Sequence, residues 1–129
     1  VDAFIPLGDS LWISGAAWEG RLLTDVRGGI FQGVNAARGP GIASVGGWVE
    51  VGAKAAAWLD VHAGMSTDDP ETYDLTAGMR SANKIFYAAA IARFGTVTVG
   101  LEFLHWITQY RAFDSGIDNR VKLYLALGF

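Results

Sequence analysis

The chain of 129 residues contains no cysteine, which excludes a disulfide scaffold and any metal site built on thiolates. Its net charge is −3 and no basic stripe runs along it, so we expect no nucleic-acid partner. No window reaches the roughly 18 consecutive apolar residues that a transmembrane helix requires. The longest apolar run, residues 85–92, has about half that length. These absences exclude a disulfide-rich domain, a basic binding protein and a helical membrane protein.

Hydrophobic residues nevertheless make up 51% of the chain and charged residues 18%, so the composition is not that of a disordered segment. Apolar side chains that are abundant but never form long runs must alternate with other residues, as they do in β-strands. The chain also has 17 glycines and only three prolines. Glycine is common where strands bend or approach one another closely. We therefore predict an all-β fold in a single domain, residues 1–129.

The last eleven residues show the alternation most clearly. One side of an extended strand here is wholly apolar, and the other carries two cations and a phenol. The apolar side consists of Val121, Leu123, Leu125, Leu127 and Phe129. The other side consists of Arg120, Lys122, Tyr124, Ala126 and Gly128. A long apolar edge is a hazard in a soluble sheet. In a membrane barrel, with lipid outside and water inside, this pattern is required.

Five other segments are predicted to be strands, and they alternate between short and long connections. The segments are 10–24, 44–54, 57–65, 83–94 and 96–111, with a short strand piece in 1–9. Tight turns are expected near Gly8, Ala56 and Gly95, and longer loops at 25–43, 66–82 and 112–118. Outer-membrane barrels have short periplasmic turns and longer external loops. We predict an antiparallel, up-and-down transmembrane β-barrel whose last strand ends at the periplasmic side.

This arrangement assigns the charged side chains to the barrel interior. The residues expected to line a pore are Glu50, Lys54, Asp60, His62, Lys84, Glu102, Arg120 and Lys122. Those expected to face lipid are Leu59, Val61, Val99, Leu101, Leu123 and Leu125. In the segment 83–94, Ile85, Tyr87, Ala89 and Ile91 are placed opposite Lys84 and Phe86. Polar residues inside and apolar residues outside are typical of a membrane barrel.

Several short motifs resemble the C-terminal third of the DcaP-like outer-membrane porins. They are Trp18-Glu-Gly-Arg21, Gly28-Gly-Ile-Phe-Gln-Gly33, Gly46-Gly-Trp-Val-Glu50, His62-Ala-Gly64, Asp68-Asp-Pro70, Asn83-Lys84, Gly100-Leu-Glu102, Trp106-Ile-Thr-Gln-Tyr110 and the final Phe129. The resemblance implies a passive diffusion pore in the bacterial outer membrane, trimeric and in contact with lipopolysaccharide, with a constriction made by loops. It also implies that the barrel-assembly machinery reads Phe129. No enzyme activity, cofactor or metal is expected.

Other readings of the same residues remain open. His62 with Asp60, near Asp68 and Asp69, could form a metal or acid–base site. Oxygen ligands from Asp68, Asp69, Glu71 and Asp74 could bind a divalent cation. Glu102, His105 and Thr108 raise the alternative of a small eight-stranded lipid hydrolase of the outer membrane. Such enzymes use a serine, a histidine and a carboxylate, but no serine follows His105 at the required spacing, and Glu102 falls on the opposite face. A structural role for a small barrel is a further possibility. A soluble, lipocalin-like barrel would turn its apolar face inward around a ligand.

The number of strands bears on whether the chain closes a barrel alone. The pattern gives about six to eight strands, whereas small closed barrels need about eight. We favour the C-terminal portion of a larger barrel over a hidden hairpin within residues 25–42, to which Gly29–Val34 could contribute. The first residue is not methionine, so we expect a chain matured by removal of a signal or a piece of a longer one.

Overall fold

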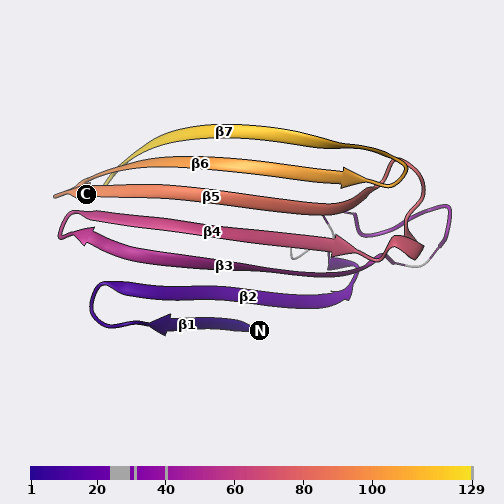
Figure 1. The fold of residues 1–129 in the computed structure, drawn as a ribbon, viewed down its shortest axis with the longest axis horizontal. Helices are drawn as coiled ribbons and strands as arrows, with labels where there is room; N and C mark the ends of the chain where they lie inside the picture. The colour runs from indigo at the N-terminus through magenta and orange to yellow at the C-terminus, as the bar shows by residue number, and fades with distance from the viewer. Residues whose placement is uncertain (24–29, 31, 40, 129) are drawn as a thin grey trace.

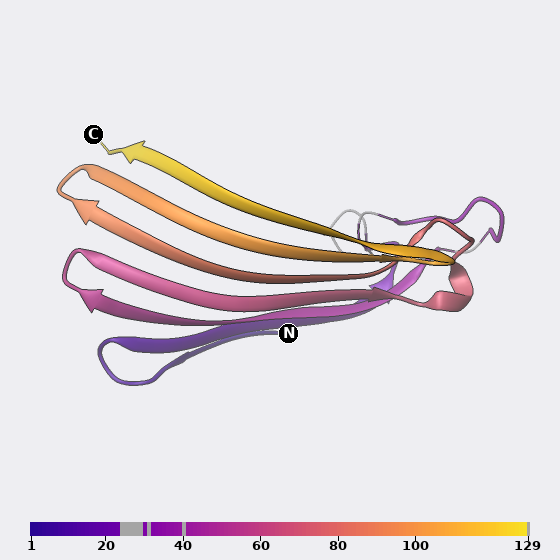
Figure 2. The ribbon, with the colours of Figure 1, turned by 45° about the horizontal axis from the view of Figure 1, so that its top comes forward.

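The structure, a computed structural model, is one curved layer of antiparallel strands (Figures 1 and 2). It describes residues 1–23, 30, 32–39 and 41–128. The elements are β1 (Asp2–Pro6), β2 (Leu11–Arg21), β3 (Ala43–Ala56), β4 (Leu59–Pro70), the 3₁₀ helix η3 (Thr72–Asp74), β5 (Arg80–Phe94), β6 (Val97–Tyr110) and β7 (Phe113–Leu127). None of the helical residues described forms a segment that could cross a bilayer.

Each strand pairs with the next one along the chain, in the order β1-β2-β3-β4-β5-β6-β7. The prediction of antiparallel, up-and-down strands is therefore confirmed, as are the short turns near Gly8, Ala56 and Gly95. Among the described residues, six longer strands and one five-residue strand match the predicted number. These turns lie at one end of the sheet, which we call the turn end; the connection between β2 and β3 lies at the other, the loop end (Figure 1).

Two of the predicted loops are wrong in extent. β4 continues through Asp68 and Asp69 to Pro70, so residues 66–70 belong to a strand. β7 begins at Phe113, and only a tight turn containing Ala112, whose φ is 65°, separates it from β6. Asp, Ser, Gly and Pro are typical of turns, which made both segments resemble loops. Cross-strand pairing overrides that local preference here.

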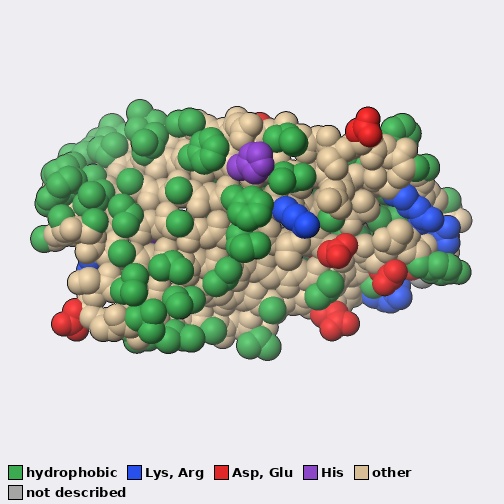
Figure 3. All heavy atoms as spheres, viewed as in Figure 1, with side chains coloured by type: hydrophobic (Ala, Val, Ile, Leu, Met, Phe, Trp, Pro, Cys, Tyr) green, Lys and Arg blue, Asp and Glu red, His purple; other side chains and the backbone are tan. Residues whose placement is uncertain are grey.

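The register assigns side chains to two faces of different chemistry. We call the polar face the one that carries Glu50, Asp60, His62, Glu102 and Lys122, and the apolar face the opposite one. All six side chains predicted to face lipid share the apolar face. Figure 3 looks onto this face: hydrophobic side chains are spread over it, most densely toward the turn end, and most of the charged ones lie toward the loop end.

The two faces also differ in exposure, because the sheet is curved. On β6, Leu101 of the apolar face is 51% exposed, whereas Leu104 of the polar face is 6% exposed. Apolar-face side chains of β7 are still more open, with Leu123 at 75%. Side chains inside a curved sheet converge and cover one another, while those outside spread apart. The polar face is therefore the inner one.

Large aromatic rings on the polar face lie across glycines of the neighbouring strand. The directly paired residues are Trp12 and Gly52, Trp18 and Gly46, Tyr87 and Gly64, and Tyr124 and Gly100. A Cβ added to Gly100 would come within 1.9 Å of the Tyr124 ring, and one added to Gly46 within 2.5 Å of the Trp18 ring. Each ring occupies the space that its partner's side chain would need. The glycines thus let bulky residues fit inside a curved sheet.

We predict that Gly100→Ala destabilises the sheet by about 1–3 kcal/mol, because the new methyl group displaces the Tyr124 ring. Gly116→Ala is the matched control, since its Cβ would meet only an ordinary contact at 3.7 Å. Denaturant unfolding of both variants measures the difference. If Tyr124 is the cause, the double variant Gly100→Ala/Tyr124→Ala loses less than the sum of its two single changes. Equal stability of Gly100→Ala and Gly116→Ala would contradict this packing.

Candidate functional site

Seven of the eight predicted pore-lining residues share the polar face, contributed by four strands. They are Glu50 and Lys54 of β3, Asp60 and His62 of β4, Glu102 of β6, and Arg120 and Lys122 of β7. Glu102 lies directly opposite Lys122, and Lys54 opposite Asp60. The structure therefore brings these charges together on one surface.

The placement of Lys84 with these residues is wrong. Lys84 pairs with Thr67 and Ile107, which puts it on the apolar face near the loop end. Its neighbour Tyr87 instead belongs to the polar face, opposite Gly64. Both faces of β5 are largely apolar at mid-strand, so alternation alone could not orient this strand. The space above Gly64 and a hydrogen bond to Glu50 accommodate Tyr87 on the polar face.

Glu50 is the centre of a hydrogen-bonded group on the polar face. Its Oε1 lies 3.1 Å from His62 Nδ1, and its Oε2 accepts a hydrogen bond of 2.8 Å from the Tyr87 hydroxyl. The edge of the Trp12 ring packs against His62 with ring centroids 5.4 Å apart. Both carboxylate oxygens are thus occupied, and the histidine is held by packing as well as by the carboxylate.

Other charges of the polar face form ion pairs. Lys122 Nζ lies 3.2 Å from Glu102 Oε2, Arg93 pairs with Asp60, and Arg120 pairs with Asp118. The Arg120 guanidinium also lies over the Trp106 ring, 5.7 Å from its centroid. Arg93 and Asp118 were not among the predicted residues, although both continue the alternation of their strands. They make the face a mixture of paired charges of both signs.

The described residues of the connection between β2 and β3 include two, Ile30 and Gln32, that bond to the sheet at the loop end. The backbone N–H of Ile30 donates to Asp68 Oδ2 at 2.9 Å, and Ser44 Oγ donates to the other oxygen of that carboxylate. Gln32 and the backbone of Arg80 exchange two hydrogen bonds, of 2.7 and 2.9 Å. Asp68 and Ile30 are both buried. The loop is therefore fastened to the inner wall of the sheet.

Asp74 of η3 fastens the same loop at its base. Its Oδ2 accepts hydrogen bonds of 2.9 Å from both Arg21 Nη1 and the Ala43 N–H, while its backbone oxygen accepts one of 2.7 Å from Asn35 Nδ2. Asp74 is 4% exposed. One buried carboxylate thus joins the end of β2, the start of β3 and the β4–β5 connection. No pattern within the sequence indicated this role, because the partners are far apart along the chain.

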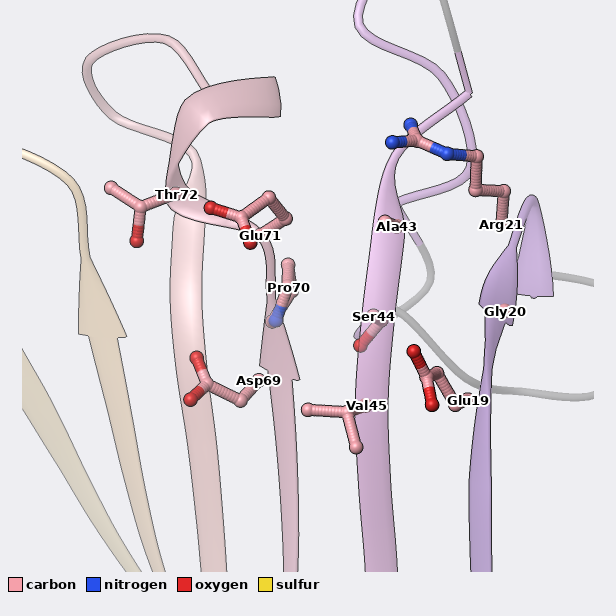
Figure 4. Close-up of a pocket in the computed structure, with 10 residues that line it drawn as sticks. All are labelled: Glu19, Gly20, Arg21, Ala43, Ser44, Val45, Asp69, Pro70, Glu71 and Thr72. Atoms are coloured by element: carbon pink, nitrogen blue, oxygen red, sulfur yellow. The ribbon is translucent and has the colours of Figure 1, made fainter.

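A cavity of about 440 Å³ opens at the loop end and is drawn in Figure 4. Glu19, Val45 and Asp69 line it from three adjacent strands, and they belong to the apolar face. Arg21 is directed away from these acids and toward Asp74. No group of residues among those described is suited to hold a metal ion. The predicted alternative of a metal at Asp68 and Asp69 gains no support, since they lie on opposite faces.

The residues considered for a lipid hydrolase do not meet. Glu102 lies on the polar face and His105 on the apolar face, where His105 Nδ1 lies 2.7 Å from Asn119 Oδ1. Thr108 donates to Asn83 at 2.8 Å. A nucleophile and its base must lie within hydrogen-bond reach, and these side chains do not.

No family model, curated protein or solved structure matches the chain. The similarity to DcaP-like porins therefore stays a prediction from the sequence. The terminal Phe129 and part of the motif at residues 28–33 lie outside the described residues. Gly29 of the possible hairpin also lies outside them.

We predict that Asp74→Ala releases the loop, because Arg21, Asn35 and the Ala43 N–H surround this position and two of them lose their acceptor. The Arg21 side chain is 57% exposed and can bind water instead, so the main loss is the acceptor of the Ala43 N–H, which costs about 1 kcal/mol. Trypsin should then cut faster after Arg38, an exposed loop residue. Asp114→Ala is the control, since Asp114 is exposed and makes no side-chain hydrogen bond or ion pair with the described residues. Equal cleavage rates in both variants would contradict the anchoring role.

Proposed function

We propose that this chain forms part of the wall of a water-filled β-barrel in the bacterial outer membrane, and that the barrel is a porin for small hydrophilic solutes. The observation that carries the proposal is the opposite chemistry of the two faces of one uncovered sheet. Large apolar side chains such as Val121, Leu123 and Leu125 are 66–75% exposed. In a water-soluble domain a second layer would cover such a face. Among the described residues, no element does so.

The lengths of the strands and the positions of the polar residues on the apolar face support contact with lipid. The six longer strands have 11–15 residues, and crossing the hydrocarbon takes about 9–11. Lys84 lies toward the loop end of this face, where a long side chain can reach the membrane–water boundary. His105 and Asn119 bond to each other, which lowers the cost of placing their polar groups beside lipid.

The inner position of the polar face favours a pore over a soluble, lipocalin-like barrel. A lipocalin-like barrel would have its apolar face inside. Here the loop containing Ile30 and Gln32 is fastened over the polar face, and Leu104 of that face is buried. Paired charges inside, with a loop that narrows the mouth, suit the passage of water and small solutes.

We further propose that other strands complete the barrel. β1 and β7 are the edges of the sheet and do not pair with each other. An open edge in hydrocarbon leaves backbone N–H and C=O groups unpaired, at several kcal/mol for each group. Strands from a longer form of the same protein would remove this cost. With the sequence resemblance, we extend the proposal to a trimer in contact with lipopolysaccharide, assembled through recognition of Phe129.

Single-channel recording of the protein purified from membranes tests the pore. We expect open-channel conductance whose preference for cations falls in Glu50→Gln and in Glu102→Gln, because each change removes a negative charge from the lumen. Glutamine keeps the shape and one acceptor oxygen, so the fold is retained. Glu19→Gln, which removes the same charge from the apolar face, should leave the selectivity unchanged. Absence of conductance contradicts the porin, and unchanged selectivity in both lumen variants contradicts the assignment of these residues to the solute path.

A further inference from the structure

The polar face carries a patch of large apolar side chains that a simple water-filled pore does not need. This aromatic patch consists of Trp18, Trp48, Ile85, Tyr87, Leu104 and Trp106. Two cavities open on it, of about 340 Å³ and 360 Å³. Trp18 and Ile85 line both, and Ser66 adds a hydroxyl to each. The patch lies between the charged pairs of mid-strand and the loop fastened at the mouth.

The rings of the patch are held in orientations suited to stacking. Trp18 packs over Gly46 and Tyr87 over Gly64, each in the space that a side chain on the glycine would fill. Trp48 is 38% exposed and lines the same cavity as Trp18 and Tyr87. Flat, immobilised aromatic surfaces bind flat apolar surfaces of a ligand at little cost in side-chain entropy.

Most charged groups around the patch already have partners. Glu102 is paired with Lys122, Asp118 with Arg120, and both oxygens of Glu50 are occupied by His62 and Tyr87. An ionic ligand would compete with these interactions. A neutral ligand with many hydroxyl groups can donate to the carboxylates and accept from the cations without breaking them. Donors and acceptors of both kinds beside an aromatic surface fit such a ligand.

We infer that the aromatic patch binds neutral carbohydrates in their ring form, with the C–H face of the sugar ring stacked on Trp48 and its neighbours. The inference rests on the proposed function, because a pore supplies the route by which solutes reach this face. It adds the class of solute to that function. An open-chain polyol has similar hydroxyl groups but no ring face, and therefore binds less.

The experiment compares cellobiose with sorbitol on the protein purified from membranes. Cellobiose should interrupt the single-channel current, and sorbitol at the same concentration should not. Trp48→Ala should weaken cellobiose binding about tenfold, the equivalent of one lost aromatic stack. Trp48→Phe should retain part of the binding. Trp58→Ala is the matched control, since Trp58 stacks on Phe94 at the turn end, 5.4 Å between ring centroids, away from the patch.

Tryptophan fluorescence titration with the same two solutes separates failure of this inference from failure of the porin proposal. If the pore conducts but cellobiose neither interrupts the current nor changes the fluorescence, the inference is wrong and the pore stands. It is also wrong if Trp48→Ala and Trp58→Ala bind cellobiose equally well. If the protein does not conduct but calorimetric titration shows cellobiose binding that Trp48→Ala weakens and Trp58→Ala retains, the binding site stands and the pore is wrong.

Discussion

The alternation of side chains along a strand is the constraint on which the rest of this structure depends. Neighbouring residues of an extended chain point to opposite faces, so a single layer of strands has two surfaces and no interior between them. Here one surface carries Leu101 and Leu123 and the other Glu102 and Lys122, each pair directly opposite across β6 and β7. No other layer among the described elements buries either surface. The chemistry of each face therefore indicates the solvent that it meets.

On the inner face of the curved sheet, large rings and charged groups are accommodated by pairing with residues of neighbouring strands. Rings lie over glycines, as Trp12 does over Gly52, and carboxylates lie beside cations, as Asp60 does beside Arg93. Such pairs keep the wall of the sheet thin while leaving few charges without a partner. The buried carboxylates Asp68 and Asp74 serve a different purpose, since they accept hydrogen bonds from backbone N–H groups at the loop end and hold the described loop residues against the sheet.

The sequence was sufficient to predict the strands, their antiparallel order and most of the faces, because alternation and turn residues are local signals. It was insufficient for β5, where Lys84 and Tyr87 were assigned to the wrong faces; alanines on both sides of that strand removed the contrast. Asp68 and Asp114 resembled loop residues until their strand pairing was known. Asp74 bonds to partners 31 and 53 residues away, and Arg93 to a partner 33 residues away. Patterns within a single sequence carry no information about such distant contacts.

Cysteine scanning along β6 tests most directly the proposal that the two faces of the sheet meet lipid and water, and the chain has no native cysteine to interfere. Single cysteines would replace Val99, Leu101 and Phe103 of the apolar face, and Thr98, Glu102 and Thr108 of the polar face. With the protein in lipid vesicles, a charged thiol reagent should modify the polar-face positions, while spin labels at the apolar-face positions respond to oxygen dissolved in the lipid. Equal reaction with the charged reagent on both faces would contradict the account.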